Sequence, residues 1–224
     1  MIYTIYSRPK VGKTTLALRD APKGKTAIIS ADQGLIGFSK AELQGITVEE
    51  DVSAKNITKL MNGAFLRSHT RIIVDTATSL HGAFLFEMAG GGQPSQPQYG
   101  TANSAIAAMI RTLRSEKDKE NIILAQEKLI MPNEDWVSDD IDEETGIMTT
   151  VDLSPGATSA LMQMSDVIAR LYIAHVDGKA LRRLWLGPSS SIVSGARSKV
   201  YKGDPAYLKL PSIGKLNTLL GWTR

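Results

Sequence analysis

The residues best suited to chemistry stand near the start of the chain, in the segment SRPKVGKTT at residues 7–15. Its spacing follows the phosphate-loop pattern G-x-x-x-x-G-K-[ST], except that Ser7 occupies the first glycine position. Such a loop opens a helix, so its backbone N–H groups and the helix dipole attract phosphate oxygens. We predict that the whole segment binds nucleotide phosphates: Ser7, Arg8, Pro9, Lys10, Val11, Gly12, Lys13, Thr14 and Thr15.

Three positions of this loop have separate tasks. Lys13 brings a positive charge to the β- and γ-phosphates and counts as a catalytic group. Thr14 offers its hydroxyl to Mg²⁺. Gly12 leaves room where a Cβ would collide with the approaching phosphate. The expected ligand is a nucleoside triphosphate with Mg²⁺.

Polar side chains also end three apolar, strand-like runs. RIIVD ends at Asp75, where a carboxylate can hold Mg²⁺. AIISAD ends at Asp32, a candidate base for the attacking water, and NIILAQ ends at Gln126, an amide that can bond the γ-phosphate or the water. Taken alone, Asp32 or Gln126 at such a position is more often a turn residue than a catalytic group. Their value is positional, because ends of parallel strands meet at one edge of a sheet.

The elements that must position these groups alternate between short apolar runs and helical patterns. Helices are expected at 13–19, 54–67 and 101–116, between strands that read as continuous apolar runs. Near the C-terminus, two strand-like runs meet at Asp177-Gly178, a pair suited to a tight hairpin turn. We therefore predict an α/β fold with a mostly parallel central sheet flanked by helices and antiparallel edge strands near the C-terminus.

Two segments interrupt this regularity. Residues 88–100 are rich in Gly, Pro and Gln, which disfavours both helix and central strand. From 133 to 152 there are eight acidic residues and no basic one, whereas 179–224 carry nine basic residues and one acidic residue. Long loops in a compact domain are often functional. The basic C-terminal segment fits either a solvated surface or a nucleic-acid footprint.

Length and composition restrict the number of domains and the location that the protein can have. A chain of 224 residues with 42% hydrophobic and 22% charged residues suits one globular domain, 1–224. The absence of cysteine excludes disulfides and thiolate metal sites. The sequence contains no run of about 18 apolar residues, which is the length that would suggest a membrane-spanning helix. We expect no membrane contact and an intracellular protein.

At the four motif-bearing strand ends, in the same order, the sequence resembles the RecA-type recombinase core. More closely, it is similar to short phage RecA-like ATPases that act with single-strand annealing systems, as in PQYGTANSAIAAMIRTLR and GARSKVYKGDPAYLKLPSIGKL. The resemblance spans most of residues 2–216. It implies a phage or prophage protein in the cytoplasm of a bacterial host.

The resemblance also implies partners and roles. ATP and Mg²⁺ would be the cofactors, with Asp32 as base, Gln126 as γ-phosphate sensor, and Thr14 and Asp75 on the metal. Single-stranded DNA would be bound by loops at 77–103 and 127–156. Arg197 and Lys199 look like the basic pair that a neighbouring subunit inserts toward the γ-phosphate. That role implies a homo-oligomer, either a ring or a filament.

Departures from the family pattern leave alternatives open. Asp32 is one methylene shorter than the family's glutamate, which predicts slower turnover, and the second DNA loop is acidic. A second hypothesis is therefore an ATP-dependent switch or loader that engages a replication protein, such as a single-strand DNA-binding protein, with little hydrolysis. A small-molecule kinase is a third. Four aromatic residues could stack on bases or pack internally: Phe84, Phe86, Tyr99 and Trp136.

Overall fold

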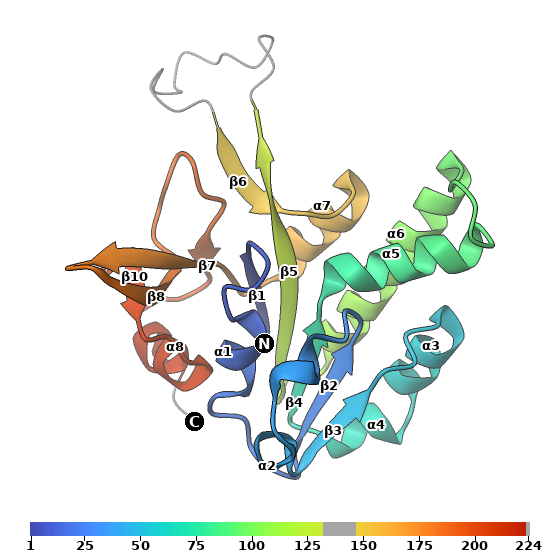
Figure 1. Cartoon of the computed structure of the whole chain (residues 1–224), viewed down its shortest axis with the longest axis horizontal. Helices are drawn as coiled ribbons and strands as arrows, with labels where there is room; N and C mark the ends of the chain where they lie inside the picture. The colour runs from blue at the N-terminus through green and yellow to red at the C-terminus, as the bar shows by residue number, and fades with distance from the viewer. Residues whose placement is uncertain (132–146, 223–224) are drawn as a thin grey trace.

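The computed structural model describes residues 1–131 and 147–222, and one sheet runs through it (Figure 1). The sheet order is β10-β8-β7-β1-β5-β4-β2-β3, with β6 paired to β5 and β9 to β7. The strands are β1 (Ile2–Ser7), β2 (Thr26–Ser30), β3 (Ile46–Glu49), β4 (Arg71–Asp75), β5 (Glu120–Ile130), β6 (Met148–Val151), β7 (Val167–Val176), β8 (Lys179–Trp185), β9 (Gly195–Ala196) and β10 (Tyr207–Lys209).

Helices cover both faces of this sheet, so its central strands are buried on both sides. The helical elements are α1 (Lys13–Leu18), η1 (Gly34–Gly37), α2 (Lys40–Leu43), α3 (Ala54–Asn62), α4 (Ala64–Ser68), α5 (Ala77–Met88), α6 (Gln96–Ser115), α7 (Pro155–Met164) and α8 (Ile213–Leu220). Apolar side chains of α3 to α7 pack on one face, and those of α1 and α8 pack on the other. Figure 1 shows α5 and α6 on one side of the sheet and α8 on the other.

The predicted fold class is confirmed. Strands β3, β2, β4, β5, β1 and β7 are all parallel, and β8 and β10 extend the sheet with antiparallel pairing. The β7–β8 turn lies at Asp177 and Gly178, whose φ angles are 49° and 73°. Positive φ at both central residues is what a tight two-residue hairpin requires, and Asp and Gly tolerate it.

The prediction of a long loop at 77–103 is wrong. Helix α5 fills its first half, and α6 begins at Gln96, so only the seven residues 89–95 connect them. A capping box explains the early start of α6: the Ser95 and Gln98 side chains each bond the backbone of the other. Pro97 also stands in the first turn, where its missing N–H costs no hydrogen bond. The expected helix at 54–67 is likewise split, at Gly63, into α3 and α4.

The segment predicted as a second loop, 127–156, contains regular structure. Strand β5 continues to Ile130 and pairs with β6 in an antiparallel ribbon, and α7 begins at Pro155. Figure 1 shows this ribbon extending beyond the rest of the sheet. Trp136 and seven of the eight acidic residues lie outside the described residues.

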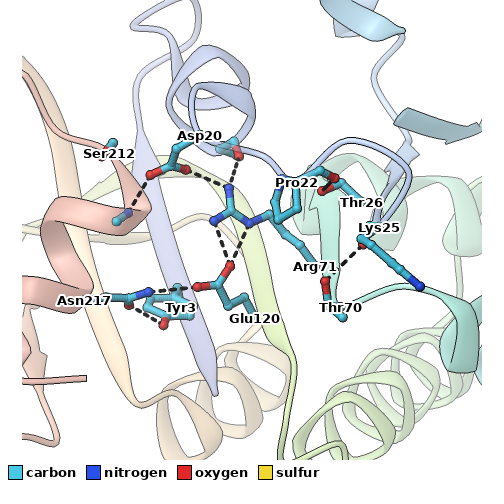
Figure 2. A network of polar contacts seen from close by, with 12 residues as sticks. Tyr3, Asp20, Pro22, Lys25, Thr26, Thr70, Arg71, Glu120, Ser212 and Asn217 are labelled. Atoms are coloured by element: carbon cyan, nitrogen blue, oxygen red, sulfur yellow. Dashed lines mark hydrogen bonds and ion pairs between the residues drawn. The ribbon is translucent and has the colours of Figure 1, made fainter. Parts of the chain in front are cut away.

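The buried side chain of Arg71 joins several elements near the amino ends of strands β4 and β5 (Figure 2). The guanidinium of Arg71 donates to Asp20 Oδ1 at 2.7 Å, to Glu120 Oε2 at 2.8 Å and to the carbonyl of Ala17 at 3.2 Å. Asn217 of α8 donates to the second oxygen of Glu120 at 2.8 Å. The network therefore joins α1, β4, β5 and α8.

Removing this guanidinium is expected to be costly. We predict that Arg71→Met lowers the free energy of unfolding by about 3–5 kcal/mol, because it strands two carboxylates that face one buried cation. Urea unfolding followed by circular dichroism measures the change. The matched control is Arg67→Met on the exposed surface of α4, which should stay within about 0.5 kcal/mol. A loss of similar size in both variants would contradict the prediction.

The loss of stability at acid pH should also depend on the Arg71 network. Burial alone would raise the pKa of Asp20, but hydrogen bonds from Arg71 and Gly214 hold that pKa below its usual value. A depressed carboxyl pKa contributes stability above the unfolded-state pKa, and this stability is lost as pH falls through the folded-state pKa. We expect a smaller loss of stability below about pH 4 in Arg71→Met than in the wild type.

Candidate nucleotide site

The candidate site lies where the carboxyl ends of four parallel strands meet. Pairing places Ser7 of β1 beside Gln126 of β5, and Ser30 of β2 beside Asp75 of β4. This alignment follows from the parallel register, since equivalent ends of neighbouring strands lie at one edge. Groups separated by more than a hundred residues thus reach one place.

The loop between β1 and α1 has the backbone that its glycine predicts. Gly12 has a φ of 103°, in the left-handed region that side chains disfavour, and helix α1 begins at the next residue. A Cβ at Gly12 would lie 2.7 Å from Nε of Arg182, so the position is also crowded. Substitution here would therefore strain the backbone and displace a neighbouring cation.

The ammonium of Lys13 joins the loop to Gln126 in the middle of β5. It donates to Ser7 Oγ at 3.2 Å, to the carbonyl of Arg8 at 3.3 Å and to Gln126 Oε1 at 3.4 Å. Burial lowers the pKa of Lys13, while the nearby carboxylates of Asp75 and Asp32 oppose that shift. Ser7 belongs to extended β1 and its hydroxyl donates to the carbonyl of Arg8 at 2.8 Å, so a serine is accommodated without positive φ.

Thr14 and Asp75 form a pair suited to a divalent cation. The Thr14 hydroxyl donates to Asp75 Oδ2 at 2.8 Å, and Oδ1 of Asp75 is buried without a hydrogen-bond partner among the described residues. Burial, reinforced by Asp32, raises the pKa of Asp75 to about 6. An unpartnered carboxylate oxygen beside a hydroxyl is a donor set that Mg²⁺ accepts, so these residues fit the metal.

Asp32 and Gln126 reach the same cavity in different ways. Asp32 is exposed, and its Oδ1 accepts from the Gly34 N–H at 3.0 Å, which leaves Oδ2 as an acceptor. Gln126 is fixed through its backbone, whose N–H donates to Thr78 Oγ1 at 3.0 Å and whose carbonyl accepts from Asp152 at 2.8 Å. Gln126 is thus the more rigidly held of the two.

A cavity of about 340 Å³ brings these groups together. That volume falls in the range of small-ligand sites. Its lining residues are Pro9, Lys10, Gly12, Lys13, Thr14, Thr15, Asp32, Gly34, Phe38, Asp75, Gln126 and Arg182. Of the predicted loop residues, Ser7 reaches the site through Lys13, whereas Arg8 and Val11 border a neighbouring cavity.

The family comparison agrees with a nucleotide-binding loop in this setting. The profile of the AAA domain family matches residues 1–198. The chain belongs to this family. No curated protein matches this chain. Among solved structures, it is similar to a KaiC-like protein of the archaeon Pyrococcus horikoshii OT3, with 10% identity, a TM-score of 0.46, and coverage of 82% of this chain and 76% of that one.

The family makes the chain an AAA-type ATPase domain, in which the predicted phosphate loop joins β1 to α1. Strand β5, which carries Gln126, lies between the phosphate-loop strand β1 and the Asp75 strand β4. In the described part of the chain, no helix is both long and apolar enough to cross a membrane.

The predicted basic pair does not line this cavity. Arg197 and Lys199 are exposed and follow β9, which pairs with the first residues of β7. Those residues of β7 lie beside the start of β1, near Tyr3, at the opposite end of the parallel strands from the phosphate loop. The Arg197 N–H donates to the Asp166 carbonyl at 2.7 Å. A role for this pair at a phosphate site therefore requires another subunit and stays a prediction.

Three lining residues were missed from the sequence: Gly34, Phe38 and Arg182. Phe38 follows η1, and Arg182 lies in β8 within the run ALRRLW. The two adjacent arginines of that run point to opposite faces of the sheet, because side chains alternate along a strand. Nothing in the sequence shows which face lies next to the phosphate loop.

The buried carboxylate supplies a test of the metal site. At pH 7 we expect Asp75→Asn to raise the stability of the nucleotide-free protein by about 1–3 kcal/mol, since a buried charge is removed. The wild type should lose stability as pH rises from about 4 to about 6, because the folded state holds the Asp75 proton more tightly, and the variant should not. Denaturant unfolding across this pH range measures both.

The exposed turn residue Asp177 provides a control, since Asp177→Asn changes the same atoms without burial. Asp75→Asn should also make nucleotide binding insensitive to added Mg²⁺, which isothermal titration can follow. Equal stability of Asp75→Asn and the wild type at pH 7 would contradict the burial argument.

Proposed function

We propose that this AAA domain is a Mg²⁺-dependent ATPase of the phage RecA-like type that binds single-stranded DNA and promotes annealing or recombination. Its setting would be the cytoplasm of a bacterial host. The nucleotide part rests on the family and on the cavity around Lys13. The DNA part rests on the resemblance of the motifs and on the surfaces described below.

The roles in hydrolysis follow from the positions of the side chains. Lys13 would bind the β- and γ-phosphates, while Thr14 and Asp75 would hold Mg²⁺. Bound Mg²⁺ supplies charge neutralisation on the phosphate oxygens. The free Oδ2 of Asp32 would accept the proton of the attacking water, and the Gln126 amide would bond the γ-phosphate or orient that water.

The observation that carries the proposal is the continuity of β5 from the cavity into the ribbon. Gln126 lines the cavity, and the next residue, Glu127, has a side chain only 3% exposed. Glu127 pairs with Arg170 at 2.9 Å and with Arg8 of the phosphate loop at 3.3 Å. A change at Gln126 can therefore be transmitted to the β5–β6 ribbon through one rigid strand and its ion pairs.

Other surfaces of the protein are suited to contact single-stranded DNA. Phe86 and Tyr99 are 68% and 42% exposed on α5 and α6, whereas Phe84 is buried in the core. Exposed aromatic rings can stack on bases. The segment 179–224 adds its excess of basic residues. These features support a DNA contact away from the acidic residues of 133–152.

A second candidate is the ATP-dependent switch or loader. The exposed position of Asp32, with one oxygen already engaged by Gly34, favours weak hydrolysis. The acidic segment next to the ribbon would then engage a replication or recombination protein instead of a phosphate backbone. In this reading ATP binding alters the ribbon, and turnover resets it.

ATP hydrolysis measured with and without single-stranded DNA separates the two candidates. We expect DNA to stimulate turnover, and Lys13→Ala to abolish both basal and stimulated activity, because the phosphate charge loses its main partner. Lys55→Ala, an exposed charge removal on α3, is the matched control. Turnover that ignores DNA, with no binding in a salt titration, would favour the switch.

Assembly has its own test, based on complementation. Arg197→Ala and Lys13→Ala should each be nearly inactive as separate oligomers. Their mixture should regain activity, since a Lys13→Ala subunit can supply its intact Arg197 to the intact cavity of a neighbour. Lys202→Ala, another exposed cation nearby, should stay active alone. If Arg197→Ala alone keeps wild-type turnover and oligomer size, the role in trans is wrong.

A further inference from the structure

The antiparallel hairpin at the edge of the sheet contributes one cation to the nucleotide cavity. Arg182 of β8 lines this cavity together with Lys13, Thr14 and Asp75. Among the described lining residues it is the only arginine, and neither the sequence motifs nor the family resemblance assigns it a role. It therefore differs from the basic pair Arg197 and Lys199, which lies away from the cavity.

The contact between Arg182 and the loop is specific. Its Nε donates to the carbonyl of Val11 at 2.8 Å, at the residue before Gly12. The guanidinium also fills the space that a Cβ of Gly12 would need, with Nε 2.7 Å and Nη2 3.4 Å from that position. The Arg182 side chain is thus held against the phosphate loop at Val11 and Gly12 by one of its nitrogens.

The remaining donors of Arg182 are available for a ligand. Among the described residues, the only hydrogen bond that its guanidinium makes is the one to Val11, and no carboxylate forms an ion pair with it. A guanidinium presents donors in a planar fork that matches phosphate oxygens in a bidentate manner. An exposed arginine that faces a phosphate loop with two free nitrogens has the chemistry of a phosphate clamp.

We propose that Arg182 binds the polyphosphate of the nucleotide in cis, as a second cation beside Lys13. The clamp comes from β8, whose Arg182 carbonyl accepts from Leu210 at 3.3 Å at the end of β10. Nucleotide binding would therefore also order β8 and β10, which belong to the basic C-terminal segment 179–224. This inference rests on nucleotide binding at the cavity but not on DNA binding or on assembly.

Equilibrium binding of a fluorescent ATP analogue to the full chain, with Mg²⁺ present, tests the clamp. We expect Arg182→Ala to raise the Kd for the analogue by about 10- to 100-fold, the size expected for a charged hydrogen bond. Arg182→Lys should lose less, because it keeps the charge but not the fork. Inorganic pyrophosphate should compete less well with the analogue on Arg182→Ala than on the wild type, whereas competition by adenosine should be unchanged.

Arg183→Ala is the matched control. Arg183 is the next residue of β8 and lies over the Tyr207 ring at 4.4 Å, on the other face of the strand. Its removal takes away the same charge without touching the cavity, so the Kd should change less than twofold. Thermal unfolding of all variants without nucleotide detects any loss of fold.

Two results would overturn the inference. Arg182→Ala could lower the melting temperature and leave the Kd for the analogue unchanged, which would make Arg182 only a brace for the loop. Its Kd values for adenosine and for the analogue could also rise by the same factor, which would place the contact on the nucleoside. If Lys13→Ala binds the analogue as tightly as the wild type, the nucleotide site itself is wrong.

Discussion

The geometry of the site depends on how β4 holds the short helix α1 at both ends. Arg71, at the start of β4, donates to the Ala17 carbonyl and to Asp20 at the end of the helix. Asp75, at the end of the same strand, accepts from Thr14 in the first turn. A helix of six residues has little stability of its own. These two polar contacts therefore set the position of the phosphate loop relative to Asp75, the proposed Mg²⁺ ligand.

The positions of the cationic residues separate those that line the cavity from those that could act only on the cavity of another subunit. Lys13 and Arg182 reach the phosphate loop from within the chain, one from α1 and one from the edge hairpin. Arg197 and Lys199 are exposed and lie toward the opposite end of the parallel strands. A single chain thus lines the cavity with three cationic residues, Lys10, Lys13 and Arg182. Under the assembly proposal, further positive charge for hydrolysis would come from a neighbouring subunit.

Strand β5 connects the Arg71 network, the candidate nucleotide cavity and the β5–β6 ribbon. Its first residue, Glu120, joins the buried Arg71 network, Gln126 lines the cavity, and its last residues form the ribbon with β6. Glu127 fixes the middle of this strand by pairing with Arg8 and Arg170. Both candidate functions use this connection, and they differ only in what the ribbon and the neighbouring surfaces contact.

The sequence by itself determined the α/β class, the phosphate loop, the hairpin at Asp177-Gly178 and the strand end at Asp75, because each depends on local spacing and on an unbroken apolar run. The strand predicted to end at Gln126 instead continues to Ile130, because β5 pairs with β6 beyond the apolar run. The prediction also failed at 77–103, where the capping box at Ser95 overrode a composition typical of a loop. Only the tertiary structure decided that Arg182 lies at the loop and Arg197 does not. That choice depends on how the β7–β8 hairpin is placed beside β1, through a long-range pairing of β7 with β1 that no local pattern encodes.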